Sequence, residues 1–204
     1  MTAVIEATLS WLFKNARGRD EKSFFKGPAF AEHKEPTITI TSPDCGETGV
    51  TLSKEYIAEG GGKIPSLEWR TPDDIASSVK EWLLFVEDPD APLPTPIAHG
   101  IYGGIPPTKT SVTPADFEIE DESQALLKGG FHYGKNRRSK VYIPPRPLLN
   151  HGVHRYFFEI IALSEPVNKE LLSKCVSREE IAEAIKDKVL GWGLWVGSCE
   201  RRWE

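Results

Sequence analysis

Glycine and proline interrupt this chain so often that little room remains for long helices. The sequence contains 17 Gly and 16 Pro among 204 residues, and turn residues gather in segments 44–49, 60–62, 89–96, 103–107 and 144–152. Glycine permits left-handed turns, and proline lacks the amide donor that helices and central strands require. The chain is therefore expected to fold mainly into short strands joined by turns.

Three apolar segments between these turns are predicted strands. Residues 37–41 alternate with period two and lie between Pro36 and Pro43, as in a strand with one buried face. Residues 79–86 and 153–163 are denser apolar runs without clean alternation. Such runs are typical of strands that are covered on both faces.

Two helices are also expected. The N-terminal one ends near Gly18 and should pack through an apolar face made of Val4, Ile5, Thr8, Leu9 and Leu12. The second covers residues 177–190, because Ser177-Arg178-Glu179-Glu180 is a capping-box sequence and Gly191 is a stop signal. With no repeat or long linker, residues 1–204 are expected to form one domain, in which residues 1–30 are a helical N-terminal extension.

Charge and cysteine content argue against several classes of protein. The chain has 25 basic and 30 acidic residues, a net charge of −5, whereas nucleic-acid binders draw affinity from clustered Lys and Arg. The one basic run, 135–140, is more typical of a solvated loop than of a phosphate site. Three cysteines without a CxxC pattern predict neither a disulfide framework nor a zinc site. With no secretory signal and no apolar stretch of roughly 18 residues to span a bilayer, we expect a cytoplasmic protein.

Two carboxylates follow the predicted strand that ends at Val86. Asp88 and Asp90 lie two residues apart, with Pro89 between them. An extended backbone places such residues on one side, so both are expected to face a common pocket. An Asp-Pro turn without a further role is the alternative.

Histidines supply the remaining candidate groups. His154 and Tyr156 should share one face of the last predicted strand, and Arg155 should take the other. Residues three apart in an extended segment point in opposite directions, so His151 and His154 are not expected to bind a metal, and no cofactor is implied. His99 should return on a neighbouring strand after a Pro-rich turn, and a buried structural histidine is the alternative.

These motifs, in this order, resemble the phosphatidylethanolamine-binding protein family, also called the Raf kinase inhibitor protein family. The resemblance is carried by Asp-Pro-Asp-Ala-Pro at 88–92, then His99, then a Pro-rich loop that leads into Gly-x-His-Arg-Tyr at 152–156. It extends from about residue 37 to residue 163, and the two ends of the chain look like a fungal branch of the family. It implies a β-sandwich of antiparallel strands with a few peripheral helices, one of them C-terminal, and an anion pocket at the strand ends.

By motif position, the resemblance implies a ligand site made of Asp88, Asp90, His99, Pro145, Arg146, His154 and Tyr156. Arg155 looks structural. Pro144 stands where the family usually has glycine, which removes one amide donor from the pocket wall. Arg146 is expected either to bind a carboxylate or phosphate or to point into solvent.

The leading functional prediction is a protein that binds a small anion or a phospholipid head group. The resemblance implies a kinase or a protease as candidate protein partners, and the Trp-rich end, Trp192 to Trp195 with Trp203, either closes the core or meets a partner such as a second copy of the chain. A carboxylate beside a histidine raises the pKa of the imidazole, so anion binding should strengthen as the pH falls toward about 6.

The alternative is an enzyme of fungal secondary metabolism of the maleidride type. It would assist the cyclising dimerisation of anhydride or carboxylate monomers, with catalytic residues Asp88, His99, Arg146 and His154. Carboxylates, imidazoles and an arginine supply a base, an acid and an anion clamp, but the same residues suit a pocket that only binds.

Overall fold

The computed structural model describes residues 3–203, and most of its regular structure is strand. The strands are β1 (Thr39–Thr41), β2 (Val50–Thr51), β3 (Leu67–Arg70), β4 (Glu81–Asp88), β5 (Ile97–Ile105), β6 (Ser111–Val112), β7 (Ile119–Asp121), β8 (Leu126–Leu127), β9 (His132–Tyr133), β10 (His154–Leu163) and β11 (Val189–Cys199).

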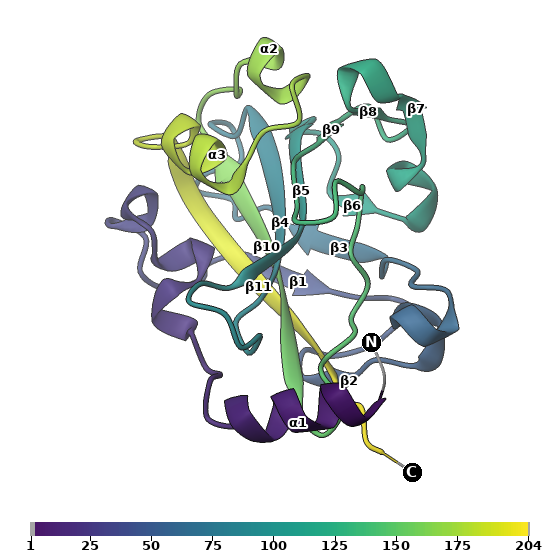
Figure 1. The fold of residues 1–204 in the computed structure, drawn as a ribbon. Coiled ribbons are helices and arrows are strands. Elements are labelled where there is room, and N and C mark those ends of the chain that lie inside the picture. The colour runs from purple at the N-terminus through teal and green to yellow at the C-terminus, as the bar shows by residue number, and fades with distance from the viewer. Residues whose placement is uncertain (1–2, 204) are drawn as a thin grey trace.

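These strands form two sheets (Figure 1). The larger has the order β2-β11-β10-β4-β5-β9-β8-β7, and the smaller has the order β1-β3-β6. All pairs are antiparallel except β2 with β11, which is parallel. The predicted mainly β fold with two sheets and few helices is confirmed.

The central strands of the large sheet are buried on both faces, as the dense apolar runs predict. On β4, Trp82 and Leu84 pack in the core that includes residues of the small sheet, whereas Leu83 and Phe85 pack in a second core that includes residues of the helical segments. Burying each such side chain contributes about 1.5–3 kcal/mol. The end of this strand is therefore fixed in position by hydrophobic packing on two sides.

The helices are α1 (Ala3–Phe13), α2 (Lys169–Leu172) and α3 (Arg178–Ala184). The capping box of Ser177 and Glu180 begins α3 as predicted, but the helix does not extend to residue 190. Val189 already pairs with Leu163 in the large sheet, and an α-helix cannot continue into a strand ladder. The last element is therefore β11, in which Trp192 and Trp195 are buried.

The helix α1 lies across the lower ends of β10 and β11 in Figure 1, at the opposite end of the molecule from α2 and α3. The prediction that it packs through its apolar face is wrong for Ile5 and Leu12, whereas Leu9 is half-buried and the side chain of Val4 lies outside the described part of the chain. Ile5 and Leu12 are 51% and 64% exposed, whereas Glu6 and Ser10 are only 2% and 1% exposed. Buried Glu6 attaches this helix to the rest of the protein through ion pairs with Arg146 and Arg201. Residues 1–2 of the predicted extension lie outside the described residues.

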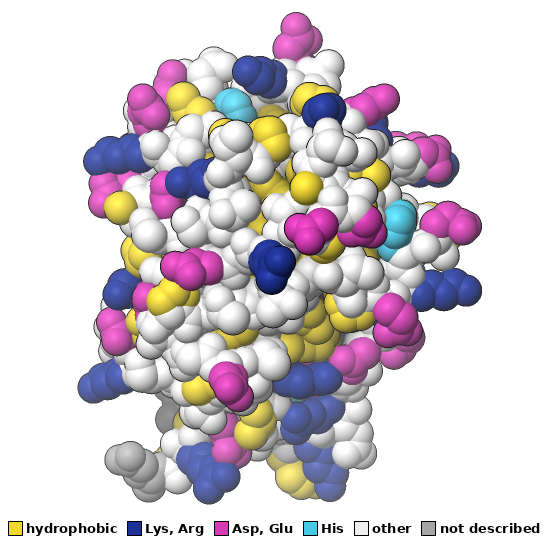
Figure 2. Space-filling model, turned by 180° about the vertical axis from the view of Figure 1, so that it is seen from behind, with side chains coloured by type: hydrophobic (Ala, Val, Ile, Leu, Met, Phe, Trp, Pro, Cys, Tyr) yellow, Lys and Arg dark blue, Asp and Glu magenta, His cyan; other side chains and the backbone are white. Residues whose placement is uncertain are grey.

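Charged side chains of both signs are spread over the face seen in Figure 2, and Lys and Arg gather near its lower end. Within residues 3–203, no helix is long and apolar enough to cross a membrane.

One buried acid interrupts the second core. Glu159 on β10 is fully buried on the same face as Phe157 and Ile161. Burial raises its pKa well above the usual range, the negative charge of neighbouring Glu87 raises it further, and Arg178 opposes the shift. Arg178 instead pairs with Glu87 at 2.5 Å. Glu159 is therefore expected to keep its proton in the folded protein at pH values where the unfolded chain releases it.

We predict that replacing this proton-binding acid reduces the pH dependence of stability. The folded state binds one more proton than the unfolded state, so stability should fall as the pH rises above the ordinary glutamate pKa of about 4.3. In Glu159→Gln this slope should become shallower, by up to about 1.4 kcal/mol per pH unit. Chemical denaturation at several pH values measures it. Exposed Glu68 on β3 provides the control: Glu68→Gln should keep the original slope, and an unchanged slope in Glu159→Gln would contradict the assignment.

Candidate functional site

A cavity of about 420 Å³ opens where the lower ends of β4, β5 and β10 meet α1. Eight of its eighteen lining residues have charged or polar side chains and ten are apolar. The lining consists of Glu6, Leu9, Phe13, Asp88, Ala91, Pro92, Leu93, Ile97, His99, Arg137, Arg138, Ile143, Pro144, Arg146, Pro147, Leu148, His154 and Tyr156. Five of the predicted site residues, Asp88, His99, Arg146, His154 and Tyr156, are thus brought together.

Asp88 is the last residue of β4, and both of its carboxylate oxygens are engaged. Oδ1 accepts hydrogen bonds from the backbone amides of Asp90 at 2.8 Å and Ala91 at 3.0 Å. Oδ2 lies 2.8 Å from Nδ1 of His154. The side chain therefore closes the turn after the strand and orients a histidine, and it has no unoccupied oxygen with which to act on a ligand.

His154 continues this contact toward α1. Its Nε2 lies 2.7 Å from Nδ1 of His151, whose Nε2 donates to the carbonyl of Phe13 at 2.9 Å. The expectation that His151 and His154 point apart is wrong, because β10 begins only at His154 and Gly152 turns the chain with a φ of 90°. Among residues 3–203, no group of three or more His, Cys, Asp or Glu side chains is arranged to hold a metal ion.

One contact in this chain of side chains has a fixed direction, because the Phe13 carbonyl can only accept a hydrogen bond. Nε2 of His151 therefore carries a proton. The two imidazole rings together connect the carboxylate of Asp88 to the end of α1.

His99 reaches the cavity because of a β-bulge. Val86 on β4 pairs with Gly100 on β5, but the next residue, Glu87, pairs with Ala98. His99 is therefore the extra residue of β5, and bulges of this kind redirect a side chain that strict alternation would place elsewhere. Its ring lies at 85° to that of Tyr156, with centroids 5.1 Å apart.

The hydrogen bond of His99 determines its tautomer. Nδ1 lies 2.5 Å from the carbonyl oxygen of Ile143, which can only accept, so Nδ1 carries the proton and Nε2 of the neutral ring presents a lone pair. Burial lowers the pKa of His99, and the charge of Asp88 opposes this shift without cancelling it. The expected rise in the imidazole pKa is therefore wrong for His99, whereas the expected tighter anion binding toward about pH 6 stays a prediction.

Two buried polar atoms of this cavity have no hydrogen-bond partner among the described residues. They are Nε2 of His99 and the hydroxyl oxygen of Tyr156. Burial raises the pKa of Tyr156 well above its usual value, the charge of Asp88 adds to this effect, and the backbone amide of Arg146, which faces the hydroxyl oxygen outside ordinary hydrogen-bond geometry, opposes it. The hydroxyl therefore keeps its proton, and the two groups offer a ligand one acceptor and one donor side by side.

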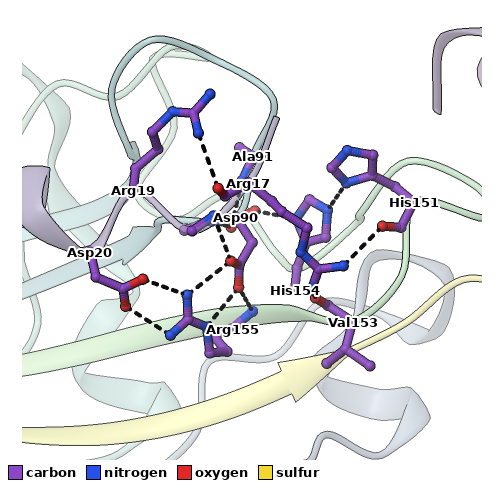
Figure 3. A network of polar contacts seen from close by, with 11 residues as sticks. Arg17, Arg19, Asp20, Asp90, Ala91, His151, Val153, His154 and Arg155 are labelled. Carbon is purple, nitrogen blue, oxygen red and sulfur yellow. Dashed lines mark hydrogen bonds and ion pairs between the residues drawn. The ribbon is translucent and has the colours of Figure 1, made fainter. Parts of the chain in front are cut away.

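Asp90 does not face the cavity, contrary to the prediction. The strand ends at Asp88, and the following turn directs Asp90 to the other side of β10. There its Oδ2 lies 2.8 Å from Nε of Arg155, whose terminal nitrogens bind Asp20 (Figure 3). Burial alone would raise the pKa of Asp90, but hydrogen bonds from Arg155 hold it below the usual range. This network ties the segment after α1 to the sheet, in line with a structural Arg155. Pro145 is also absent from the cavity lining.

Arg146 lines the cavity but is engaged by acidic partners. One terminal nitrogen lies 3.0 Å from Glu6 on α1, and Nε lies 3.4 Å from Glu59. Arg201 binds the same two acids at 3.0 and 2.7 Å. Burial alone would raise the pKa of Glu6, but Arg146 and Arg201 hold it below the usual range. The two alternatives for Arg146, a ligand clamp or a solvated side chain, thus omitted the role that the structure shows: it helps to attach α1.

Sequence motifs alone did not identify several residues of this site. Glu6 and Phe13 come from α1, which gave no signal beyond its helical spacing. Arg137 and Arg138 line the mouth of the cavity, although their basic run predicted only a solvated loop. For these residues that the motifs missed, the basic run at 135–140 was the sequence feature that could have indicated a role at the cavity.

The structure thus combines a β-sandwich of two sheets with a cavity at its strand ends, in which His99 and Tyr156 lie at the buried end. The chain belongs to the phosphatidylethanolamine-binding protein family, whose model matches residues 41–200. Two relatives are called phomoidride biosynthesis cluster protein B. The one from a fungal species (strain ATCC 74256) is 49% identical over 98% of this chain and 96% of its own length. The one from Talaromyces stipitatus is 48% identical over 98% and 82%.

Solved structures show the same fold. A putative phosphatidylethanolamine-binding protein homologue from Chlamydia trachomatis is 24% identical with a TM-score of 0.65, and the match covers 82% of this chain and 99% of that one. An Escherichia coli protein described as a new member of the mammalian family is 23% identical with a TM-score of 0.64, over 80% and 98%.

We predict that the charge of Glu6 holds α1 over the cavity. In Glu6→Gln, Arg146 and Arg201 keep only Glu59 as an acidic partner, so amides of residues 3–13 should exchange with deuterium about tenfold faster, which corresponds to about 1.4 kcal/mol. Hydrogen-exchange mass spectrometry measures this. Glu55 forms an exposed ion pair with Lys63, so Glu55→Gln serves as control and should leave α1 unchanged. Unchanged exchange in Glu6→Gln would show that other contacts hold the helix.

Proposed function

We propose that this protein is an enzyme of a fungal biosynthetic pathway that assists the cyclising dimerisation of an unsaturated anhydride or carboxylate monomer. The proposal selects the second of the two functions that the sequence left open. Asp88 and His154 are engaged with each other, and Arg146, whose side chain is 41% exposed, is paired with Glu6 and Glu59. We therefore assign the action on a bound molecule to His99 and Tyr156.

The observation that supports the proposal is the buried pair of His99 Nε2 and the Tyr156 hydroxyl: within the described residues, the imidazole nitrogen has no hydrogen-bond donor and the hydroxyl proton has no acceptor. We call the buried end of the cavity, formed by His99 and Tyr156, its floor. A floor that binds an anion would offer several hydrogen-bond donors, whereas this one offers the lone pair of His99 Nε2 beside a single donor, the Tyr156 hydroxyl. A neutral imidazole next to a phenol is suited to removing a proton from carbon while the hydroxyl stabilises the adjacent oxygen. The apolar lining strengthens both interactions because it excludes water.

The proposed reaction balances without any further reagent. His99 Nε2 takes a proton from carbon, and the electron pair of that C–H bond moves toward the carbonyl oxygen, which accepts a hydrogen bond from Tyr156. The resulting carbanion forms a carbon–carbon bond to the double bond of a second monomer. The electron pair displaced there takes the proton back from His99. Two such additions close a ring, and the product has twice the mass of the monomer.

The remaining polar residues act as positioning groups. The charge of Asp88 favours the protonated form of His99 and so reduces the cost of forming the imidazolium, a cost that burial and the charges of His154 and Arg137 increase. His154 and His151 connect Asp88 to α1, which supplies Leu9 and Phe13 to the cavity wall. In this scheme Arg146 is not a catalytic residue.

The relatives support the pathway assignment. Both fungal proteins that resemble this chain over nearly its whole length carry the name of a biosynthesis cluster protein. Binding of an anion or a phospholipid head group without turnover is the competing function, and it is one outcome of the test below.

We predict that the purified protein converts an alkyl-substituted unsaturated cyclic anhydride into products of twice the monomer mass, detected by liquid chromatography and mass spectrometry. The rate should exceed that of a sample without protein at equal pH. Calorimetric titration with phosphate and phosphorylethanolamine runs in parallel. Binding of these anions without any dimer formation would favour the binding function and overturn the enzyme proposal.

We predict that His99→Asn lowers turnover by about 10²-fold or more, since the base is lost, and that Tyr156→Phe lowers it by about 10²-fold. His33 lines no part of this cavity, so His33→Asn should retain full activity. Full turnover by His99→Asn would exclude His99 as the base.

We also predict how activity depends on pH. Burial lowers the pKa of His99, the charge of Asp88 opposes this shift, and the charges of His154 and Arg137 add to it. The base must be unprotonated to act, so activity should persist below about pH 6.5 and fall in more acid solution.

A further inference from the structure

Two arginines at the mouth of the cavity have no acidic partner. Arg137 and Arg138 line the cavity and are exposed to solvent. Neither guanidinium forms an ion pair or a hydrogen bond with another residue in the part of the chain that the structure describes. The two acids of the lining have other partners: Glu6 pairs with Arg146 and Arg201, and Asp88 contacts His154. Two positive charges therefore remain available at the entrance.

The loop that carries these arginines is fixed to the strand that carries His99. The side chain of buried Asn136 donates to the carbonyl of His99 at 3.3 Å and to that of Lys140 at 2.6 Å. Its oxygen accepts from the amides of Arg138 at 3.1 Å and Lys140 at 3.2 Å. One side chain thus sets the position of the arginine loop relative to the floor, which is the kind of support that a binding site requires.

The floor and the mouth make different demands on a ligand. At the floor, neutral His99 and the Tyr156 hydroxyl favour a neutral carbonyl over a carboxylate, because no full positive charge is present there. At the mouth, two arginines favour an anion. The lining also includes the apolar side chains of Leu9, Phe13, Leu93, Ile97 and Leu148.

We propose that Arg137 and Arg138 form an outer anion subsite, so that the cavity selects a molecule with a neutral acyl group at one end, an apolar body and a carboxylate at the other. The proposal rests on the function proposed above, in which the floor receives an anhydride or similar carbonyl. It adds the class of substrate, namely an acyl compound that also carries a free acid. The charge of Arg137 also lowers the pKa of His99, which places this guanidinium within electrostatic range of the floor.

The test compares two probes of equal length by isothermal titration calorimetry at one fixed ionic strength. Monomethyl suberate carries one ester and one carboxylate, and dimethyl suberate carries two esters. The wild-type protein should bind the monoester at least about tenfold more tightly than the diester, as expected for a charge-assisted hydrogen bond. The double variant Arg137→Ala/Arg138→Ala should bind both probes with the affinity that the wild type has for the diester.

Lys135 and Lys140 provide a matched control, because they flank the arginines in the same loop and line no part of the cavity. The variant Lys135→Ala/Lys140→Ala loses the same charge and should keep the preference for the monoester. Equal losses in the two double variants would indicate general electrostatic attraction and overturn the subsite.

The outcomes separate this inference from the proposed function. If the wild type binds monoester and diester equally well, the outer subsite is wrong while an acyl-binding floor stands. If it binds neither probe and forms no dimer from the anhydride, both the subsite and the proposed function are wrong. An unchanged preference for the monoester in Arg137→Ala/Arg138→Ala would also overturn the subsite.

Discussion

The hydrogen bond between Asp88 and His154 is the contact on which the architecture of the cavity depends. It joins the end of β4 to the beginning of β10, two neighbouring strands that the packed sheet already fixes on both faces. His151 extends it to the last carbonyl of α1, so the floor of the cavity and its cover belong to one continuous chain of contacts. Asp88, His154 and His151 form hydrogen bonds with one another and with α1. The proposed function therefore assigns the contacts with a ligand to the neighbouring residues His99 and Tyr156.

The polar groups on the two sides of β10 differ in what they contact: one set lines the cavity, and the other forms ion pairs with the segment after α1. Asp88 and His154 face the cavity, whereas Asp90 and Arg155 lie on the other side and bind the segment after α1 through Asp20. Arg155 forms close ion pairs with two acids, which suits attachment of a chain segment rather than exchange with a ligand. The result is an ion-pair network behind a cavity in which, among the residues that the structure describes, His99 Nε2 and the Tyr156 hydroxyl form no hydrogen bond of ordinary geometry.

Electrostatic attachment explains the orientation of α1. Glu6 is buried between two arginines, and an ion pair of this kind needs both partners because an isolated buried charge is costly. Because Glu6 faces the two arginines, Trp11 and Leu12 face outward and are 72% and 64% exposed. The cover of the cavity is therefore held by a few charges rather than by a large apolar surface, and its hold depends on Glu6.

The sequence by itself determined the mainly β fold, the strands around residues 79–86 and 153–163, and the family motifs, because these depend on local alternation, turn chemistry and residue order. It could not determine the partner of each polar side chain. The bulge that redirects His99, the turn that sends Asp90 away from the cavity, and the pairing of Arg146 with Glu6 all depend on segments far apart in the chain. Whether a charged group binds a ligand or another residue is decided by the free energy of burial at its final position, and only the tertiary structure specifies that position.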